Sequence, residues 1–375
     1  MEFKVNSKEL EKLLTKIIPA VPTRTPMQIL ENFLFEIKEG TLTIIATDLE
    51  ISMKSSINIV SEGDISIVVP AKLTHDILKS LGDTTVNFEI TDNNKINLTT
   101  DNGEYSISYL SAEEYPEIPQ FPTETDDINE ISFNGLELKN AFDITSFAMS
   151  KEEMRPAMMG TLLEFEDEGL RFVATDGHRL ANLLKKNIIA EIDDKYVVPE
   201  KAISVLQKIL DEKEVKMFMS NTHISFQLND IELITRLIGQ KYPEYRSVIP
   251  LENEYDLKLK TKELLTAIKR MMLFSATSST RRVKFSISEN NLEISAEDID
   301  MGNFGKENIM CEYTGSPIEI GFNSQYVNDV LSHLVAEEEI IFKLHSSNKA
   351  VIIVPSKSKE NQDLMMLIMP VRLNN

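Results

Sequence analysis

The sequence predicts an α+β protein made of three homologous domains, each with two helices packed on antiparallel sheets. Three observations lead to this prediction. At 375 residues the chain is too long for one ordinary hydrophobic core. One order of strands and helices occurs three times along it. Most of the remaining segments alternate apolar and polar residues, which is typical of strands with one face in a core.

Each of the three repeats opens with an alternating strand followed by an amphipathic helix. The openings are FKVNSKELEKLL from Phe3, ISFNGLELKNAF from Ile131 and LKLKTKELLTAI from Leu257. In the first of them, leucines recur at helical spacing on one side while lysines occupy the other. Each opening therefore predicts a strand and then a helix with one buried face.

An apolar strand that ends in an acidic residue comes next, and a second helix follows it. The strands are LTIIATDLE from Leu42, LRFVATDGH from Leu170 and LEISAEDID from Leu292. The second helices begin in VVPAKLTHDILKSL from Val68, VVPEKAISVLQKIL from Val197 and, more loosely, GFNSQYVNDVLSHL from Gly321. Asp48, Asp176 and Asp298 close the three strands, and we expect this repeated aspartate to cap a turn.

The repeats place the domains at residues 1–125, 126–252 and 253–375. The first two close on matching turns, YPEIP from Tyr115 and YPEYRSVIP from Tyr242. The boundaries fall in FPTETDDINE and IPLENEYDL, which are rich in proline and acids and have no apolar period, as linkers commonly are. The helical segments expected from the pattern are 7–18, 72–81, 136–148, 201–210, 262–270 and 325–336.

Charge is distributed unevenly between these elements. The whole chain has a formal net charge of −21, which disfavours binding of phosphates over its entire surface. The six helical segments together are nevertheless net positive. Lysine is a good helix former on any solvated face, which would explain a single such helix. Across all three repeats the pattern indicates a shared surface that faces a polyanion and contacts phosphates without reading bases.

Four motifs give the chain a specific resemblance. They are TDLE at Thr47–Glu50, VATDGHRLA at Val173–Ala181, YPEYRSVIP at Tyr242–Pro250 and MPVRL at Met369–Leu373. With these motifs spread over its whole length, the chain closely resembles the bacterial sliding clamps, the β subunits of DNA polymerase III. The resemblance implies the DNA clamp fold and a head-to-tail homodimer whose six domains close into a ring around double-stranded DNA. Such a ring tethers the replicative polymerase and confers processivity, with no bond made or broken.

The resemblance also implies the partners and the compartment. Besides DNA, we expect the polymerase III catalytic subunit, the clamp loader and other proteins with clamp-binding motifs, and we expect no cofactor, metal or membrane contact. The single cysteine, Cys311, fits a reducing cytoplasm, and no segment has the pattern of a secretion signal or a membrane span.

The resemblance assigns three sets of site residues. A cleft for partner peptides would use apolar anchors and a few polar groups: Arg155, Met158, Thr175, Gly177, His178, Arg179, Leu180, Pro243, Val248, Leu367, Ile368, Met369, Pro370, Val371, Arg372 and Leu373. DNA would face Arg24, Lys201, Arg281 and Arg282. Ring closure would set Tyr105 and Ile107 against Leu273 and Phe274 of the second copy. Ser247, Met158 and the Asn374–Asn375 extension depart from the usual pattern, which indicates a different partner preference.

Two other functions remain open at this point. One is an enzyme that uses Asp176 and His178 as an acid/base pair. No phosphate-cradling glycine loop, nucleophile motif or zinc-ligand spacing accompanies that pair, and the aspartate occurs in the other repeats without a histidine. The other is a protein-interaction scaffold that does not encircle DNA, against which the charge of the helices argues.

Overall fold

The computed structural model describes residues 1–122, 128–275, 281–298 and 301–373. The chain divides into two compact units. Unit 1 comprises Met1–Lys139 and Lys201–Leu237, and unit 2 comprises Asn140–Glu200 and Ile238–Asn375. These units follow contacts between residues, whereas the three predicted domains follow repeats in the sequence. The predicted boundary at 125/126 lies outside the described residues, as does the Asn374–Asn375 extension.

Helices form in all six segments where the sequence predicts them. They are α1 (Ser7–Ile17), α2 (Ala71–Leu81), α3 (Gly135–Ser146), α4 (Glu200–Ile209), α5 (Thr261–Ser275) and α6 (Ser324–His333). Asparagines precede three of them, and the side-chain oxygens of Asn6, Asn134 and Asn323 accept hydrogen bonds from backbone N–H groups of the first turn. Helix α5 continues past the predicted end at Arg270, because Met271 is buried and extends its packed face.

Unit 1 contains two antiparallel sheets. A five-stranded sheet has the order β5-β1-β7-β8-β9, and a nine-stranded sheet has the order β10-β6-β2-β3-β4-β18-β17-β16-β11. The strands of unit 1 are β1 (Glu2–Asn6), β2 (Asn32–Lys38), β3 (Thr41–Thr47), β4 (Ile51–Asn58), β5 (Val60–Ser61), β6 (Ile65–Pro70), β7 (Thr85–Thr91), β8 (Lys95–Thr100), β9 (Gly103–Ser108), β10 (Leu110–Ser111), β11 (Asn129–Asn134), β16 (Glu214–Met219), β17 (His223–Leu228) and β18 (Ile231–Arg236).

Unit 2 is built in the same manner. Its nine-stranded sheet has the order β15-β12-β13-β14-β27-β26-β25-β19-β23, and its four-stranded sheet has the order β22-β21-β20-β24. The strands are β12 (Gly160–Glu166), β13 (Gly169–Thr175), β14 (Arg179–Lys185), β15 (Lys195–Pro199), β19 (Tyr255–Lys260), β20 (Arg282–Ser288), β21 (Asn291–Asp298), β22 (Asn303–Met310), β23 (Glu312–Tyr313), β24 (Ile318–Asn323), β25 (Glu339–Leu344), β26 (Val351–Pro355) and β27 (Gln362–Ile368).

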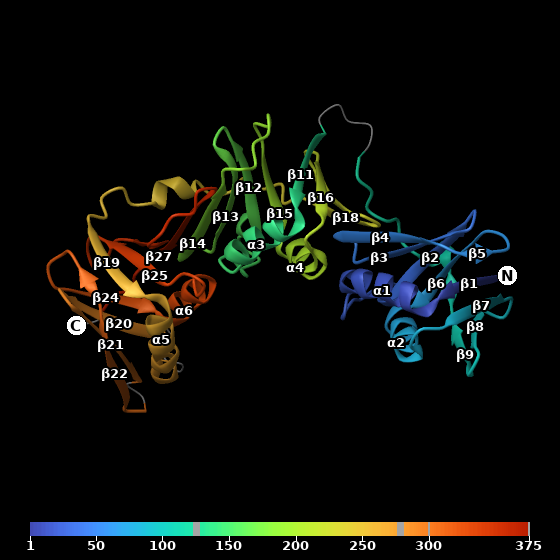
Figure 1. Cartoon of the computed structure of the whole chain (residues 1–375), viewed down its shortest axis with the longest axis horizontal. Coiled ribbons are helices and arrows are strands. Elements are labelled where there is room, and N and C mark those ends of the chain that lie inside the picture. Colours follow the sequence, from blue (N-terminus) through green and yellow to red (C-terminus); the bar gives the residue numbers. More distant parts are fainter. Residues whose placement is uncertain (123–127, 276–280, 299–300, 374–375) are drawn as a thin grey trace. The chain divides into compact units, whose positions relative to one another are not determined.

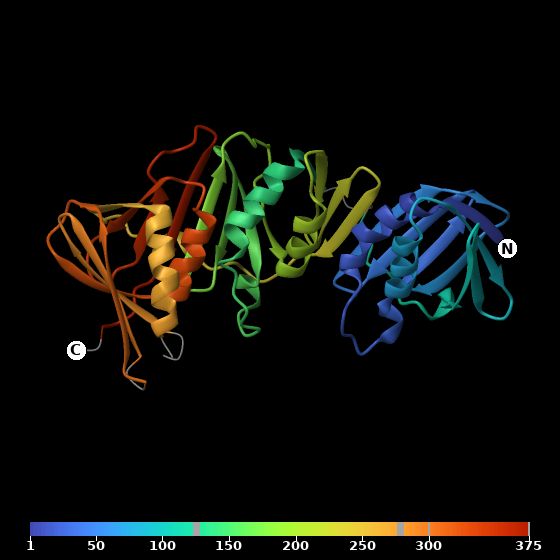
Figure 2. The same cartoon turned by 60° about the horizontal axis from the view of Figure 1, so that its bottom comes forward.

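Pairs of helices pack beside the sheets within each unit. Helices α1 and α2 contact each other in unit 1, and α5 and α6 do so in unit 2, where α5 also packs on β21 and β22 (Figures 1 and 2). Short 3₁₀ helices connect other elements at Ile18–Ala20, Gln28–Glu31, Ala112–Glu114, Pro156–Met158 and Tyr245–Val248. The predicted α+β architecture is therefore confirmed.

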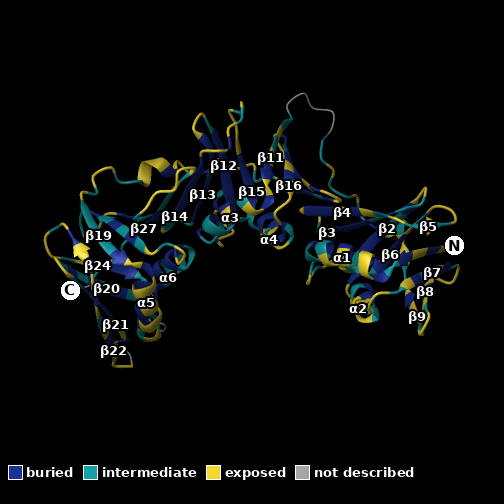
Figure 3. Cartoon of the chain, viewed as in Figure 1, coloured by how far each residue is buried: buried dark blue, intermediate teal, exposed yellow. Residues whose placement is uncertain are grey.

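The core of each unit lies where the strands and helices turn their apolar faces inward, and exposed residues gather at turns and chain reversals (Figure 3). Phe3 stacks on Phe88 in unit 1, with ring centroids 4.5 Å apart, and Phe285 meets Phe322 edge-on in unit 2. Each such fully buried ring stabilises the fold by roughly 2 to 3 kcal/mol. The sheets thus form rigid supports for the loops at their ends.

Candidate functional site

An open groove of about 520 Å³ lies in unit 2, at the end of strands β13, β14 and β27. One wall is the turn that joins β13 to β14, and the other is the segment 243–250. The residues that line it are Met158, Thr175, Gly177, His178, Arg179, Leu180, Pro243, Glu244, Tyr245, Ser247, Val248, Ile249, Pro250, Asn348, Lys349, Ala350, Leu367 and Met369. A groove of this size with a mostly apolar lining suits a short peptide.

The turn between β13 and β14 is held by hydrogen bonds from its own side chains. Oδ1 of Asp176 accepts the backbone N–H groups of His178 and Arg179, at 2.9 and 3.0 Å. The Thr175 hydroxyl accepts the N–H of Gly177 and donates to the carbonyl of Arg179. Gly177 has a φ of +88°, which favours glycine. The groove wall is consequently a preformed turn.

These contacts explain the aspartate that closes the strand in all three repeats. Oδ1 of Asp48 accepts the N–H groups of Glu50 and Ile51, and Oδ1 of Asp298 accepts that of Met301. The predicted capping role is confirmed in each copy. Oδ2 of Asp176 accepts a further bond from the guanidinium of Arg179, 3.1 Å away. Asp176 thus serves as a structural cap, and its contacts give it no acid/base role with His178.

Pairing between β14 and β27 brings together residues that are far apart in the chain. Leu180 lies opposite Leu367 in this antiparallel ladder, and the N–H of Met369 donates to the carbonyl of His178. Leu180 and Leu367 belong to one apolar cluster with Tyr242, Tyr245 and other buried residues. The floor of the groove is therefore part of the core, whereas its upper edge is open to solvent.

A buried ionic network holds the segment 243–250 against β12. Glu164 is 3% exposed, and its carboxylate accepts bonds from the Tyr245 hydroxyl at 2.5 Å and from both terminal nitrogens of Arg246 at 2.9 and 2.8 Å. Lys195 adds an ion pair. Burial alone would raise the pKa of Glu164, but these hydrogen bonds outweigh it and lower the pKa to about 2. Glu164 therefore fixes the second wall of the groove.

Ten of the predicted cleft residues line this groove, and the other six do not. The six are Arg155, Ile368, Pro370, Val371, Arg372 and Leu373. Ile368 is fully buried, because side chains alternate along a strand and its neighbours Leu367 and Met369 face the groove. The lining of this groove gives no support to Ile368, and its assignment to the cleft stays a prediction.

The end of the chain also departs from the predicted cleft. The N–H of Val371 donates to the carbonyl of Gly321, so the closing MPVRL motif turns away along β24 after Met369. Leu373 lies close to Gly321 as well. Arg155 contacts the turn, through a bond from Nη1 to the carbonyl of Asp176 at 3.4 Å, and pairs with Glu152. The assignment of these residues to the cleft stays a prediction.

Eight lining residues were missed in the sequence. Five belong to the quoted YPEYRSVIP motif, of which only Pro243 and Val248 were assigned, so the motif itself could have indicated them. The other three, Asn348, Lys349 and Ala350, precede β26 in a loop without any motif. Ser247 and Met158, which depart from the usual pattern, do line the groove.

The predicted DNA-facing cations differ in their surroundings. Lys201 pairs with Asp48 and lies 3.7 Å from a carboxylate oxygen of Glu50, and burial lowers its pKa. Its charge is thus neutralised within unit 1. Arg24, Arg281 and Arg282 have no ion pair among the described residues, and Arg24 and Arg281 are exposed. The assignment of all four residues to DNA stays a prediction.

The predicted ring-closing residues lie on the edge strand β9 in unit 1 and on helix α5 in unit 2. Tyr105 is 39% exposed on the edge strand β9, and Leu273 is 78% exposed near the end of α5. Phe274 packs over the backbone of Gly305 on the edge strand β22. Ile107 is only 4% exposed and pairs with Ile96 inside the sheet, so it belongs to the core of unit 1. The assignment of these four residues to ring closure stays a prediction.

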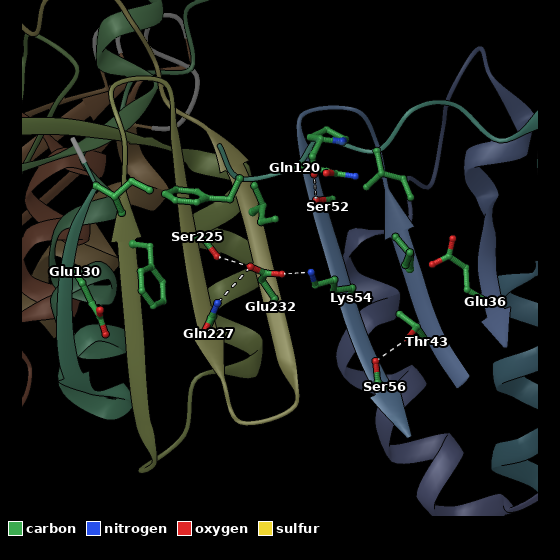
Figure 4. A pocket seen from close by; sticks show the side chains of 17 residues that line it. Glu36, Thr43, Ser52, Lys54, Ser56, Gln120, Glu130, Ser225, Gln227 and Glu232 are labelled. Atoms are coloured by element: carbon green, nitrogen blue, oxygen red, sulfur yellow. Dashed lines mark hydrogen bonds and ion pairs between the residues drawn. The ribbon is translucent and has the colours of Figure 1, made fainter. Parts of the chain in front are cut away.

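A second cavity, of about 840 Å³, lies in unit 1 over β3, β4 and β18 (Figure 4). An ion pair between Lys54 and Glu232 crosses it, and Ser225 donates to Glu232. Ser52 occupies the repeat position of Leu180, and its hydroxyl donates to the carbonyl of Pro119. Polar contacts within the chain therefore occupy the place where the groove of unit 2 offers an apolar anchor.

Two other kinds of feature are absent from the described residues. No group of three or more histidine, cysteine, aspartate or glutamate side chains is placed to hold a metal ion within these residues. Among the described helices, none is long and apolar enough to cross a membrane.

Repeated α+β units on antiparallel sheets, with a peptide-sized groove in one of them, define the structural class of the protein. Comparison with known families identifies it further. DNA polymerase III beta subunit, N-terminal domain, matches residues 1–119; the central domain of the same subunit matches 132–244, and its C-terminal domain matches 246–372. The chain belongs to the DNA polymerase III beta subunit family, whose members are the bacterial sliding clamps.

Individual relatives are similar to this chain over its whole length. The chain is 28% identical to the beta sliding clamp of Vibrio cholerae and 29% identical to that of Chlamydia pneumoniae, with complete coverage of both chains in each comparison. It is similar to the crystal structure of the DNA polymerase sliding clamp from Pseudomonas aeruginosa, with a TM-score of 0.91, 28% identity and full coverage of both chains. The sliding clamp from Bacillus subtilis matches with a TM-score of 0.91 at 27% identity, again over both entire chains.

The function follows from membership of this family. The chain is a DNA sliding clamp and acts in DNA replication as a processivity subunit of the polymerase, without catalysis of its own. The enzyme that the sequence left open is thereby excluded.

Proposed function

We propose that two copies of this chain join head to tail into a ring around duplex DNA, and that the groove of unit 2 holds partner peptides on that ring. The partners would be the polymerase III catalytic subunit, the clamp loader and other proteins with clamp-binding segments, in the cytoplasm where the DNA lies. The single observation that carries the proposal is the groove, because it joins apolar anchors to a preformed polar turn.

Exposed apolar side chains on helix α5 and on the edge strand β22 support ring closure. Leu273 near the end of α5 and Phe304 on β22 are 78% and 57% exposed, and Met310 at the end of β22 is 83% exposed. Large apolar groups gathered beside an unpaired strand are typical of a surface that another chain covers. The edge strand β9 with Tyr105 offers a second surface of this kind, and the head-to-tail dimer would bring the two edges together.

The charge of the helices supports DNA inside the ring. The chain carries a net charge of −21, yet its six helical segments are net positive. A clamp that slides needs weak attraction to phosphates at every sequence, and this attraction falls as salt rises. Arg24, Arg281 and Arg282 would add to it, because their charges have no partner among the described residues.

The groove walls indicate the kind of peptide that would bind. Val248 is 53% exposed at the rim, and Met369 is 37% exposed on the opposite side, so both can bury apolar side chains of a ligand. The turn at Gly177 and His178 supplies polar groups that can orient a peptide backbone or an amide side chain. A structural neighbour, a sliding clamp from Pseudomonas aeruginosa, is bound to griselimycin, and we propose that such ligands bind this chain in the same groove.

Val248→Asp is expected to weaken peptide binding by about a hundredfold, because it removes apolar contact and places a carboxylate where the ligand excludes water. The measurement is fluorescence anisotropy with a short fluorescein-labelled peptide that carries one glutamine and two leucine anchors. Val335→Asp is the matched control, since Val335 is 40% exposed and does not line the groove. Equal binding by both variants would contradict the groove assignment.

A further inference from the structure

Arg179 lines the groove, and its guanidinium contacts side chains from other elements of unit 2. The side chain is 12% exposed. Nε donates to Oδ2 of Asp176, and Nη1 donates to Oδ2 of Asp329 on α6. Gln325 donates to the other oxygen of Asp329 at 2.7 Å, which holds that carboxylate in place. Two carboxylates of the same unit therefore neutralise the charge of Arg179.

Two aromatic rings cover the faces of the same guanidinium. Its central carbon lies 5.3 Å from the ring centroid of Phe147 and 4.8 Å from that of Tyr326. Phe147 directly follows α3 and stacks on His333 of α6, with ring centroids 4.3 Å apart. Cation–π contacts of this kind gain strength when the cation is withdrawn from water. We call Asp176, Asp329, Phe147 and Tyr326 the arginine cage.

The cage acts on the groove through the backbone of the turn. Arg179 is the first residue of β14, and its carbonyl accepts the Thr175 hydroxyl. The preceding residue, His178, receives the N–H of Met369 at its carbonyl, and the following residue, Leu180, lines the groove. A guanidinium held by α6 therefore restrains the turn that forms one wall of the groove.

We propose that the Arg179 guanidinium has a positioning role in partner binding: it ties the groove wall to α6 through Asp329. The inference rests on the proposed peptide function of the groove. It assigns a part in binding to Asp329 and Phe147, which do not line the groove. A side chain that only stabilised the fold would lower the stability of the chain without changing the peptide affinity of the folded molecules.

The test is a double-mutant cycle between Arg179 and Asp329, with the dissociation constant of the fluorescein-labelled peptide as its readout. Asp329→Asn is expected to weaken binding about tenfold, because it removes a charge-assisted hydrogen bond that holds the turn. In an Arg179→Lys background the same change should have less than about a twofold effect, since lysine lacks the planar group that the cage encloses. Melting temperatures are recorded for every variant, so that binding is measured at a temperature at which each variant is folded.

Asp363→Asn is the matched control. Asp363 is an acid of β27 paired with Lys186, so its loss removes an ion pair of unit 2 outside the groove, and the affinity should stay within about twofold of the native value. Phe147→Leu provides a second variant of the cage if Asp329→Asn does not fold, with the same expected weakening.

The outcomes separate the positioning role of Arg179 from the assignment of the groove to partner peptides. Weakening by Asp329→Asn or Phe147→Leu, but not by Asp363→Asn, supports the positioning role. Native affinity in the cage variants, or an equal effect of Asp329→Asn in both backgrounds, overturns it while leaving the groove assignment intact. Failure of the native chain to bind the peptide would overturn the groove assignment and the positioning role together.

Discussion

Leu273→Asp is expected to convert the dimer into a monomer at micromolar concentration. The side chain is 78% exposed in the single chain, near the end of α5, and lies beside Phe274, which packs on the edge strand β22. Loss of the buried leucine removes about 2 kcal/mol, and a carboxylate in a dehydrated interface adds a further cost, so the dimer should weaken by at least about a hundredfold. Light-scattering mass across a dilution series measures the effect.

The matched control for this variant is Ile189→Asp, in the loop after β14. Ile189 is also an exposed aliphatic residue of unit 2, at 71%, and no interface is assigned to it. The control should retain the native mass at every concentration. A Leu273→Asp chain that dimerises as tightly as the control would show that ring closure uses another surface.

Glu164→Gln is expected to destabilise the chain by about 1 to 2 kcal/mol at neutral pH, because it weakens the hydrogen bonds from Tyr245 and from Arg246, which is 45% exposed and keeps Glu166 as a partner. The folded-state pKa of about 2 lies below the ordinary value of 4.5. Stability from Glu164 is therefore fully present above pH 4.5 and is lost as the pH falls toward 2. The difference in unfolding free energy between native chain and variant should shrink over that range.

Urea unfolding at a series of pH values measures this difference, and Glu168→Gln is the matched control. Glu168 is an exposed glutamate of the turn that joins β12 and β13, so its replacement should change stability by less than about 0.5 kcal/mol. The assigned pKa would be contradicted if the difference in unfolding free energy between Glu164→Gln and the native chain stayed constant from pH 7 to pH 3.

The spacing of apolar residues and short sequence motifs were sufficient to predict the helices and much of the groove. The helices follow from apolar spacing that their caps reinforce, as at Asn6 and Asn323. The turn from Thr175 to Leu180 lies within one motif, so its residues could be assigned together. Alternation along a strand could also have indicated that Ile368 is buried, since its two neighbours face the groove.

Contacts between distant parts of the chain could not be predicted in this way. The ion pair of Arg179 with Asp329 joins two elements that no motif relates, and so does the pairing of Lys201 with Asp48. Ala350 reaches the groove only because β26 and β27 pair next to β14. Such residues can be assigned to a site only when the strand order and the helix packing are known.

Retention on DNA as a function of DNA topology is the most direct test of the encircling ring. The protein is loaded onto nicked circular DNA by a clamp loader, and gel filtration in moderate salt then separates the bound protein before and after a restriction enzyme linearises the circle. We predict that the protein stays on the circle and slides off the linear form, because the link is topological and the phosphate contacts are weak. Equal retention on both forms would contradict the encircling ring.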